Sequence, residues 1–330
     1  MKKFTYDIFS LGSIDKIKWS KNFFWPISPE KTQQILNKIL EINFKSLERE
    51  KNLFFRNCFL TYNHTWNPYI VLFNYILLEK KLEKKKYKIT FSNQSKVMNY
   101  LLRKNTKFPI TVESFHFKRE FFRLLKDKVK TIIFNFRNLK FNFNEKHCVI
   151  NNKIILEQDY LKENKIWSEI VSFENLINNN FQFDNKVFEE FKKKINFIHF
   201  KSLNFAKKLQ IDIPDFVDND IIKYQYEYFK NIFTLLGSLS NSKKIKNCSK
   251  FFLDTPKTKI RAISSLVRSY GGEVVGFPHG NWICPTLTKR THYNEFLFYD
   301  EFVVYNKKQI PLFKENLKKN LKYKNITFIS

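Results

Sequence analysis

Hydrophobic and polar residues recur with helical spacing in two long segments of the chain, 186–209 and 215–236. In each segment Phe and Ile fall on one face, and Lys, Asn and Glu fall on the other. This pattern predicts two amphipathic helices whose Phe stripes belong to the hydrophobic core. Another helix is predicted to begin at Ser28-Pro29, an N-cap followed by a proline in the first helical position, and to end near Glu50.

The segment that follows contains shorter apolar runs. A helix is predicted over 69–85, and strands are predicted over 87–91 ("YKITF") and 131–136 ("TIIFNF"). The stretch 147–156 ("HCVINNKIIL") has two apolar arms separated by Asn151-Asn152, and this pattern indicates a hairpin.

The pattern changes after a polar stretch at 237–250. "KFFL" (250–253) predicts a strand, Asp254-Thr255-Pro256 predicts the capped start of a helix, and Gly271-Gly272 predicts its end. "EVVGF" (273–277) is the next predicted strand. A strand (298–305), a helix (307–319) and a last strand (325–330) follow. Strands that alternate with helices are typical of a parallel α/β sheet.

We therefore expect an α/β protein with two regions. Residues 1–237 form a helix-rich α/β region, and residues 250–330 form a parallel α/β segment.

A candidate site follows from this alternation. A right-handed crossover from "KFFL" to "EVVGF" brings Asp254-Thr255 and Pro278-His279-Gly280 to the carboxyl edge of the sheet, where α/β proteins bind ligands. The free N–H groups at the start of the intervening helix suit a phosphate. The predicted substrate-binding residues at this edge are Asp254, Thr255, Lys257, Lys259, Arg261, Gly276, Gly280 and Asn281. A second interpretation remains open, in which His279 only caps the strand.

The formal charge of +28 suggests an anionic partner. However, 50 of the 59 basic residues are lysines and only 9 are arginines, and they are spread along the whole chain. Because nucleic-acid recognition favours the planar arginine fork, this composition disfavours a nucleic-acid-binding protein. A basic surface also suits an anionic membrane or a phosphorylated substrate.

The four cysteines are far apart and form no CxxC pair, so neither a zinc site nor a disulfide framework is expected. The chain starts without a signal-peptide pattern, and no stretch approaches the ~18 apolar residues of a membrane span. We expect a cytoplasmic protein. Peripheral contact with the inner face of the membrane remains an alternative, with 69–78 ("YIVLFNYILL") as a candidate anchor.

A second polar and aromatic cluster is "TYNHTWNPY" (61–69). Sugars stack on exposed tryptophan, so His64 and Trp66 are candidates for an acceptor site. Buried aromatic residues at the entry to a helix are the alternative explanation.

The segment "GGEVVGFPHGNW", followed by "YNEFLFYDEFVVYNK", resembles bacterial surface-carbohydrate transferases of the GT-B type, and more distantly CDP-glycerol glycerophosphotransferases. The resemblance covers about 60 residues from Asp254, and His279-Gly280 matches the His-Gly pair of these enzymes. It implies catalytic roles for His279, Glu295 and Asp300. Pro278 and Asn281 depart from the residues usual at those positions.

This resemblance implies a glycosyl or glycerophosphoryl transferase with a nucleotide-sugar or CDP-glycerol donor, a carbohydrate or lipid-linked acceptor, and no bound cofactor or metal. The second Rossmann-like domain of such enzymes would be largely missing. We then expect little turnover from the isolated chain, and a last strand that lies at a sheet edge or packs poorly, with an apolar face exposed near Ile326 and Phe328. A basic nucleic-acid-binding protein and an inactive truncated remnant are the competing hypotheses.

Overall fold

The computed structural model of the 330-residue chain describes a large part of the sequence. The described residues are 29–62, 69, 72–73, 76–77, 90–92, 111–113, 147–149, 163–164, 169–170, 176–177, 181–213, 215–253, 257–278, 296–320 and 326–329.

The chain divides into two compact units, each discontinuous in sequence. One consists of Met1–Ile35, Pro68–Asn142 and Leu203–Tyr224, and the other of Leu36–Asn67, Phe143–Ser202 and Gln225–Ser330. The sequence analysis expects two regions that follow one another along the chain, 1–237 and 250–330, whereas each observed unit combines three separate segments. The difference arises because three long helices each contribute residues to both units.

The helices form where apolar residues recur at helical spacing. Their bounds are α1 (Pro29–Arg49), α2 (Leu53–Thr61), α7 (Asn185–Lys208), α8 (Asp215–Ser240), α9 (Lys243–Asn247), α10 (Thr258–Ser269), the short 3₁₀ helix η5 (Lys307–Gln309) and α12 (Ile310–Asn320). The predictions for α1, α7 and α8 are confirmed within a few residues, and α8 continues four residues beyond its predicted end. The Phe stripes are core, as predicted: the ring of Phe191 on α7 lies 4.8 Å from that of Phe55 and 5.4 Å from that of Phe229.

The larger unit contains a parallel sheet of six strands. The strands are β3 (His147–Val149), β4 (Glu169–Ile170), β5 (Lys250–Leu253), β6 (Glu273–Gly276), β7 (Glu301–Val303) and β8 (Thr327–Ile329). Their order is β4-β3-β5-β6-β7-β8, and every neighbouring pair is parallel. The parallel α/β structure predicted for 250–330 is therefore confirmed, including the direct pairing of "KFFL" with "EVVGF".

The smaller unit contains a two-stranded parallel sheet of β1 (Thr90–Ser92) and β2 (Thr111–Glu113). β1 overlaps the strand predicted over 87–91. The strand predicted over 131–136 lies outside the described residues. Within this unit the rings of Tyr69 and Phe205 both pack near Phe73.

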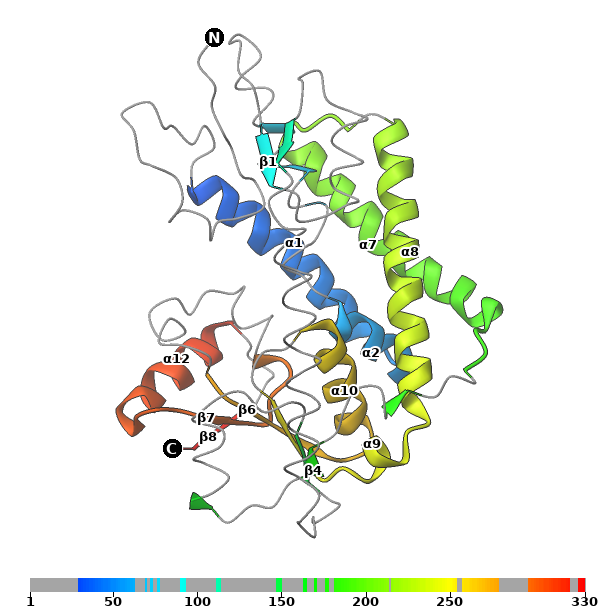
Figure 1. The fold of residues 1–330 in the computed structure, drawn as a ribbon. Coiled ribbons are helices and arrows are strands. Elements are labelled where there is room, and N and C mark those ends of the chain that lie inside the picture. Colours follow the sequence, from blue (N-terminus) through cyan, green and yellow to red (C-terminus); the bar gives the residue numbers. More distant parts are fainter. Residues whose placement is uncertain are drawn as a thin grey trace. The chain divides into compact units, whose positions relative to one another are not determined.

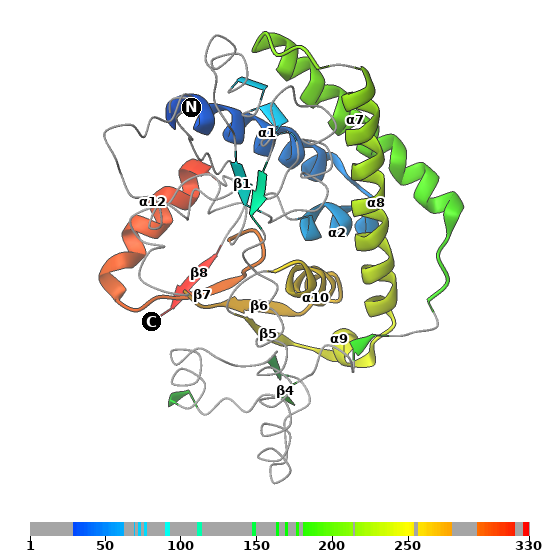
Figure 2. The same ribbon diagram turned by 45° about the horizontal axis from the view of Figure 1, so that its top comes forward.

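Helices α10 and α12 lie on the same face of the six-stranded sheet (Figures 1 and 2). The crossovers from β5 to β6 and from β7 to β8 advance in the same direction along the sheet. Because parallel crossovers share one handedness almost without exception, their helices are expected on the same face. Phe313 of α12 packs on Phe302 of β7 and Phe328 of β8, with ring centroids 5.8 and 5.5 Å apart.

The last strand, β8, lies at an edge of the described sheet, as predicted. The expectation that it exposes an apolar face is wrong. Ile326 and Phe328 are each only 8% exposed, because the rings of Phe296, Phe302 and Phe313 surround Phe328.

Two local predictions are also wrong. The hairpin predicted over 147–156 fails at its first arm, because both edges of β3 are occupied by parallel partners, β4 and β5. The helix predicted to start at Asp254-Thr255-Pro256 begins at Thr258, and its N-cap is Lys257, which makes no side-chain capping bond. The predicted end of this helix is confirmed: Gly271 adopts the left-handed φ of 87°, and the amide of Gly272 donates to the oxygen of Val267.

Candidate functional site

The carboxyl edge of the sheet brings together the ends of β5 and β6. Because the two strands are parallel and paired from Lys250 to Leu253, both run out at the same level, and the amide of Phe277 donates to the oxygen of Leu253 at 3.1 Å. The described chain then continues to Pro278, which is buried. The hydroxyl of Tyr305, from the residues that follow β7, donates to the oxygen of Pro278 at 3.2 Å. Three consecutive strands therefore contribute residues to this edge.

The direction in which the chain crosses the sheet reverses between the neighbouring strands β3 and β5. From β3 the chain goes outward to β4, whereas from β5 it crosses in the opposite direction to β6. In open α/β sheets ligands bind outside the carboxyl ends of the two strands at such a point. β5, which ends at Leu253, is one of the two strands at this point.

Helix α10 begins at the same edge. It follows β5 and precedes β6, so its N-terminus lies at the carboxyl ends of the strands and its C-terminus at the amino ends. Lys257 and Lys259 in its first turn are exposed. Two cationic side chains beside the N-terminus of a helix are a favourable environment for an anion.

Arg261 differs from these two lysines. It is only 2% exposed, its guanidinium donates to the main-chain oxygen of Tyr62 at 2.9 Å, and it lies 5.0 Å from the centre of the Phe298 ring. The side chain thus connects α10 to the end of α2 rather than presenting its charge to solvent.

Packing explains why a glycine stands at position 276, and the sequence does not show this. A β-carbon added to this residue would lie 2.5–2.6 Å from three atoms of the Tyr299 ring. The close neighbour of this strand glycine is therefore an aromatic side chain of the protein itself.

The structure separates Asp300 from this edge. Asp300 precedes β7, and its carboxylate accepts a hydrogen bond from the amide of Val274 at 3.0 Å and forms an ion pair with Arg268 at 3.2 Å. Arg268 lies in the last turn of α10. Asp300 is therefore at the amino edge, whereas Pro278, which leads to His279, is at the carboxyl edge.

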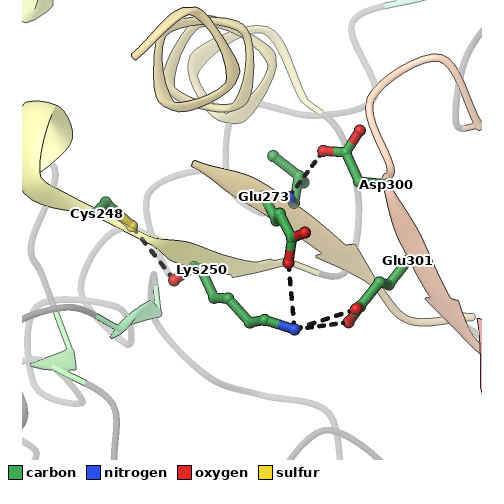
Figure 3. Close-up of polar contacts among 6 residues, drawn as sticks. Cys248, Lys250, Glu273, Asp300 and Glu301 are labelled. Atoms are coloured by element: carbon green, nitrogen blue, oxygen red, sulfur yellow. Dashed lines mark hydrogen bonds and ion pairs between the residues drawn. The ribbon is translucent and has the colours of Figure 1, made fainter. Parts of the chain in front are cut away.

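The amino edge holds a second group of charges, which the sequence analysis did not identify. The amine of Lys250 lies 3.1 Å from both carboxylate oxygens of Glu301 and 3.3 Å from Glu273 (Figure 3). Burial lowers the pKa of Lys250, but the hydrogen bonds and charges of Glu301 and Glu273 outweigh it, so the net pKa is raised. The sequence signal for this group is the alternation of side chains along β5, β6 and β7. It places Lys250, Glu273 and Glu301 on the same face of the sheet.

Several predicted site residues lie outside the described residues. They are His64, Trp66, Asp254, Thr255, His279, Gly280, Asn281 and Glu295. For these the sequence-based assignments stay predictions. The described chain leads to them at Tyr62, Leu253 and Pro278, and it resumes after Glu295 at the buried Phe296.

Among the described residues no group of three or more His, Cys, Asp or Glu side chains is arranged to hold a metal ion. None of the described helices is both long and apolar enough to cross a membrane. Comparisons of the chain with protein-family models, with curated proteins and with solved structures return no match.

Proposed function

We propose that the protein is a transferase that moves a glycosyl or glycerophosphoryl group from a nucleotide-activated donor to a carbohydrate or lipid-linked acceptor. It would act in bacterial surface-polysaccharide synthesis, in the cytoplasm or at the inner face of the membrane. The observation that carries the proposal is the convergence of the carboxyl ends of β5 and β6 with the N-terminus of α10. The resemblance of the following residues to the His-Gly segment of GT-B transferases supports it.

The chemistry assigned to this edge needs a base and an anion site. His279 takes the proton from the acceptor hydroxyl, since an imidazole can accept and release a proton at neutral pH. The hydroxyl oxygen then forms a bond to the anomeric carbon or to the phosphorus of the donor, and the bond from that atom to the phosphate oxygen of the nucleotide breaks. The nucleotide leaves with the negative charge, which Lys257 and Lys259 meet at the N-terminus of α10.

Asp300 is not part of this proposed machinery. Its ion pair with Arg268 and its bond to the amide of Val274 occupy both carboxylate oxygens at the amino edge. Glu295 keeps the acidic role implied by the resemblance, and Asp254 and Thr255 remain candidate contacts to the donor.

Donor binding is the direct test, because it does not depend on knowing the acceptor. Titration calorimetry of the 330-residue chain with UDP-sugars, GDP-mannose and CDP-glycerol should identify a donor. The K257A/K259A variant should lose affinity for it at least tenfold, and the matched K243A/K246A variant, on α9, should keep it. Whatever transfer activity the wild-type chain retains with that donor should be lost in H279A, while donor binding survives.

Two outcomes would contradict the proposal. One is the absence of binding to every nucleotide-activated donor. The other is salt-sensitive binding of nucleic acid that no nucleotide-activated donor displaces. This result would favour the nucleic-acid-binding alternative. Donor binding without turnover under any acceptor condition would identify an inactive remnant.

A further inference from the structure

Helix α7 carries two large apolar side chains on the face that points away from the core. Phe197 is 42% exposed and Phe200 is 58% exposed, while Phe191, Ile195 and Ile198 on the opposite face are buried. The two exposed phenylalanines lie outside the stripe of α7 that packs in the core. A pair of them at i and i+3 forms a continuous apolar ridge.

Lysines surround this ridge. From Phe191 to Lys208 the helix has six lysines and no Asp or Glu. With about 100° between successive residues, Lys207 falls on one side of the two rings and Lys201 and Lys208 fall on the other. Lys193, Lys207 and Lys208 are exposed and form no ion pair with a described residue.

The remaining lysine of this surface is used to cover an aromatic ring. The amine of Lys201 lies 5.4 Å from the centre of the Phe197 ring. The two acidic residues of α7, Glu189 and Glu190, lie one turn or more before the ridge, and Glu189 already pairs with Lys192 at 2.6 Å. From Phe191 on, every charged side chain of α7 is therefore a lysine, and the polar neighbours of the ridge on its own helix, Asn196 and Asn204, are uncharged.

We propose that this surface, Phe197 and Phe200 with Lys193, Lys201, Lys207 and Lys208, docks the protein on an anionic lipid membrane. A helix that lies in the membrane interface inserts its apolar side chains below the headgroups and keeps its lysines among the headgroup phosphates. An apolar centre with lysines on both flanks fits that environment. Single-stranded nucleic acid is bound in basic grooves, and this surface is the outward face of a helix.

The inference is independent of the proposed transferase function, since vesicle binding is measured without donor or acceptor. It concerns α7 alone and needs no residue of the candidate site. The two proposals can therefore fail separately.

Sedimentation with vesicles tests it. The wild-type chain should bind vesicles of equal parts phosphatidylcholine and phosphatidylglycerol, and should not bind phosphatidylcholine alone. The F197S/F200S variant should bind the anionic vesicles at least tenfold more weakly. The L53S variant, which replaces a similarly exposed apolar residue on α2, should bind like wild type.

Charge variants test the second component. K201Q/K208Q should weaken binding roughly fivefold for each lysine removed. The matched K51Q/K243Q variant removes the same charge from exposed positions on other segments and should have little effect. Because all the replaced side chains are exposed, thermal unfolding of every variant should stay close to wild type.

The result that overturns the proposal is binding to anionic vesicles that F197S/F200S leaves unchanged, because the attraction would then be only the general positive charge. Failure of the wild-type chain to bind also overturns it. A third result would assign the surface to nucleic acid and overturn the proposal: F197S/F200S no longer binds a single-stranded oligonucleotide but still binds vesicles.

Discussion

The guanidinium of Arg261 donates a hydrogen bond to the main-chain oxygen of Tyr62 and so joins the first half of α10 to the end of α2. Tyr62 is the residue from which the chain leads to His64 and Trp66. The N-terminus of α10 lies at the carboxyl edge, from which Pro278 leads to His279. The sequence analysis assigned Arg261 to substrate binding. In the structure its side chain instead joins α2, which precedes His64 and Trp66, to α10, which begins at the carboxyl edge.

Replacing Arg261 should destabilise the fold. In R261M the Tyr62 oxygen loses a charged donor and the Phe298 ring loses its cation, so we expect a loss of about 2–3 kcal/mol in the free energy of unfolding. R261K keeps the charge but not the planar fork and should recover only part of it. Urea unfolding measures the difference. R56M, an exposed arginine on α2, is the control, and equal stability of R261M and R56M would contradict the assigned role.

Gly276 should not tolerate a side chain. In G276A the new methyl group meets the buried Tyr299 ring, and overpacking of this kind costs roughly 1–3 kcal/mol. A second replacement, Y299L, should couple with G276A, since it removes the ring atoms that clash. Additive effects in the double-mutant cycle would show that the close approach is not what requires glycine. G271A provides the contrast: no atom lies within 4 Å of its added carbon, so its cost comes from φ alone.

The charge group at the amino edge should give a specific pH dependence. Folding raises the pKa of Lys250 above its ordinary value of 10.5, so folding favours the ammonium form. The stabilisation is fully present below pH 10.5 and is lost as the pH rises through the folded-state pKa. The difference in unfolding free energy between wild type and K250M, about 1 kcal/mol, should be constant near neutrality and shrink in that alkaline range. If wild type and K250M have the same free energy of unfolding at neutral pH, this assignment is contradicted.

Asp300 should behave as a structural residue. D300N weakens the ion pair with Arg268, and we expect a loss of about 1–2 kcal/mol in the free energy of unfolding. R268M in the same background should cost only what its second hydrogen bond contributes, from the guanidinium to the main-chain oxygen of Leu297, because the ion pair is already weakened. Affinity for a donor identified by calorimetry should not change. Loss of donor affinity at unchanged stability would return Asp300 to the candidate site.

Elements with local signals could be predicted from the sequence alone. The spacing of Phe and Ile defined α7 and α8, the Gly271-Gly272 pair marked the end of α10, and the strand-helix alternation after 250 indicated the parallel sheet. Each of these signals depends on residues a few positions apart, because helical and strand periodicities are properties of one segment.

Features that depend on partners far away in the sequence became apparent in the folded chain. β3 pairs with β5, about a hundred residues later, and with β4 on its other side, so neither edge is left for a local hairpin. The sequence interpretation grouped Asp300 with His279 as catalytic residues. Yet one strand of a parallel sheet separates the amino edge from the carboxyl edge, and spacing along the chain does not show at which edge a residue will lie. The burial of Arg261 depends in the same way on α2, two hundred residues earlier, because the partner of a buried charge is set by packing and not by neighbouring sequence.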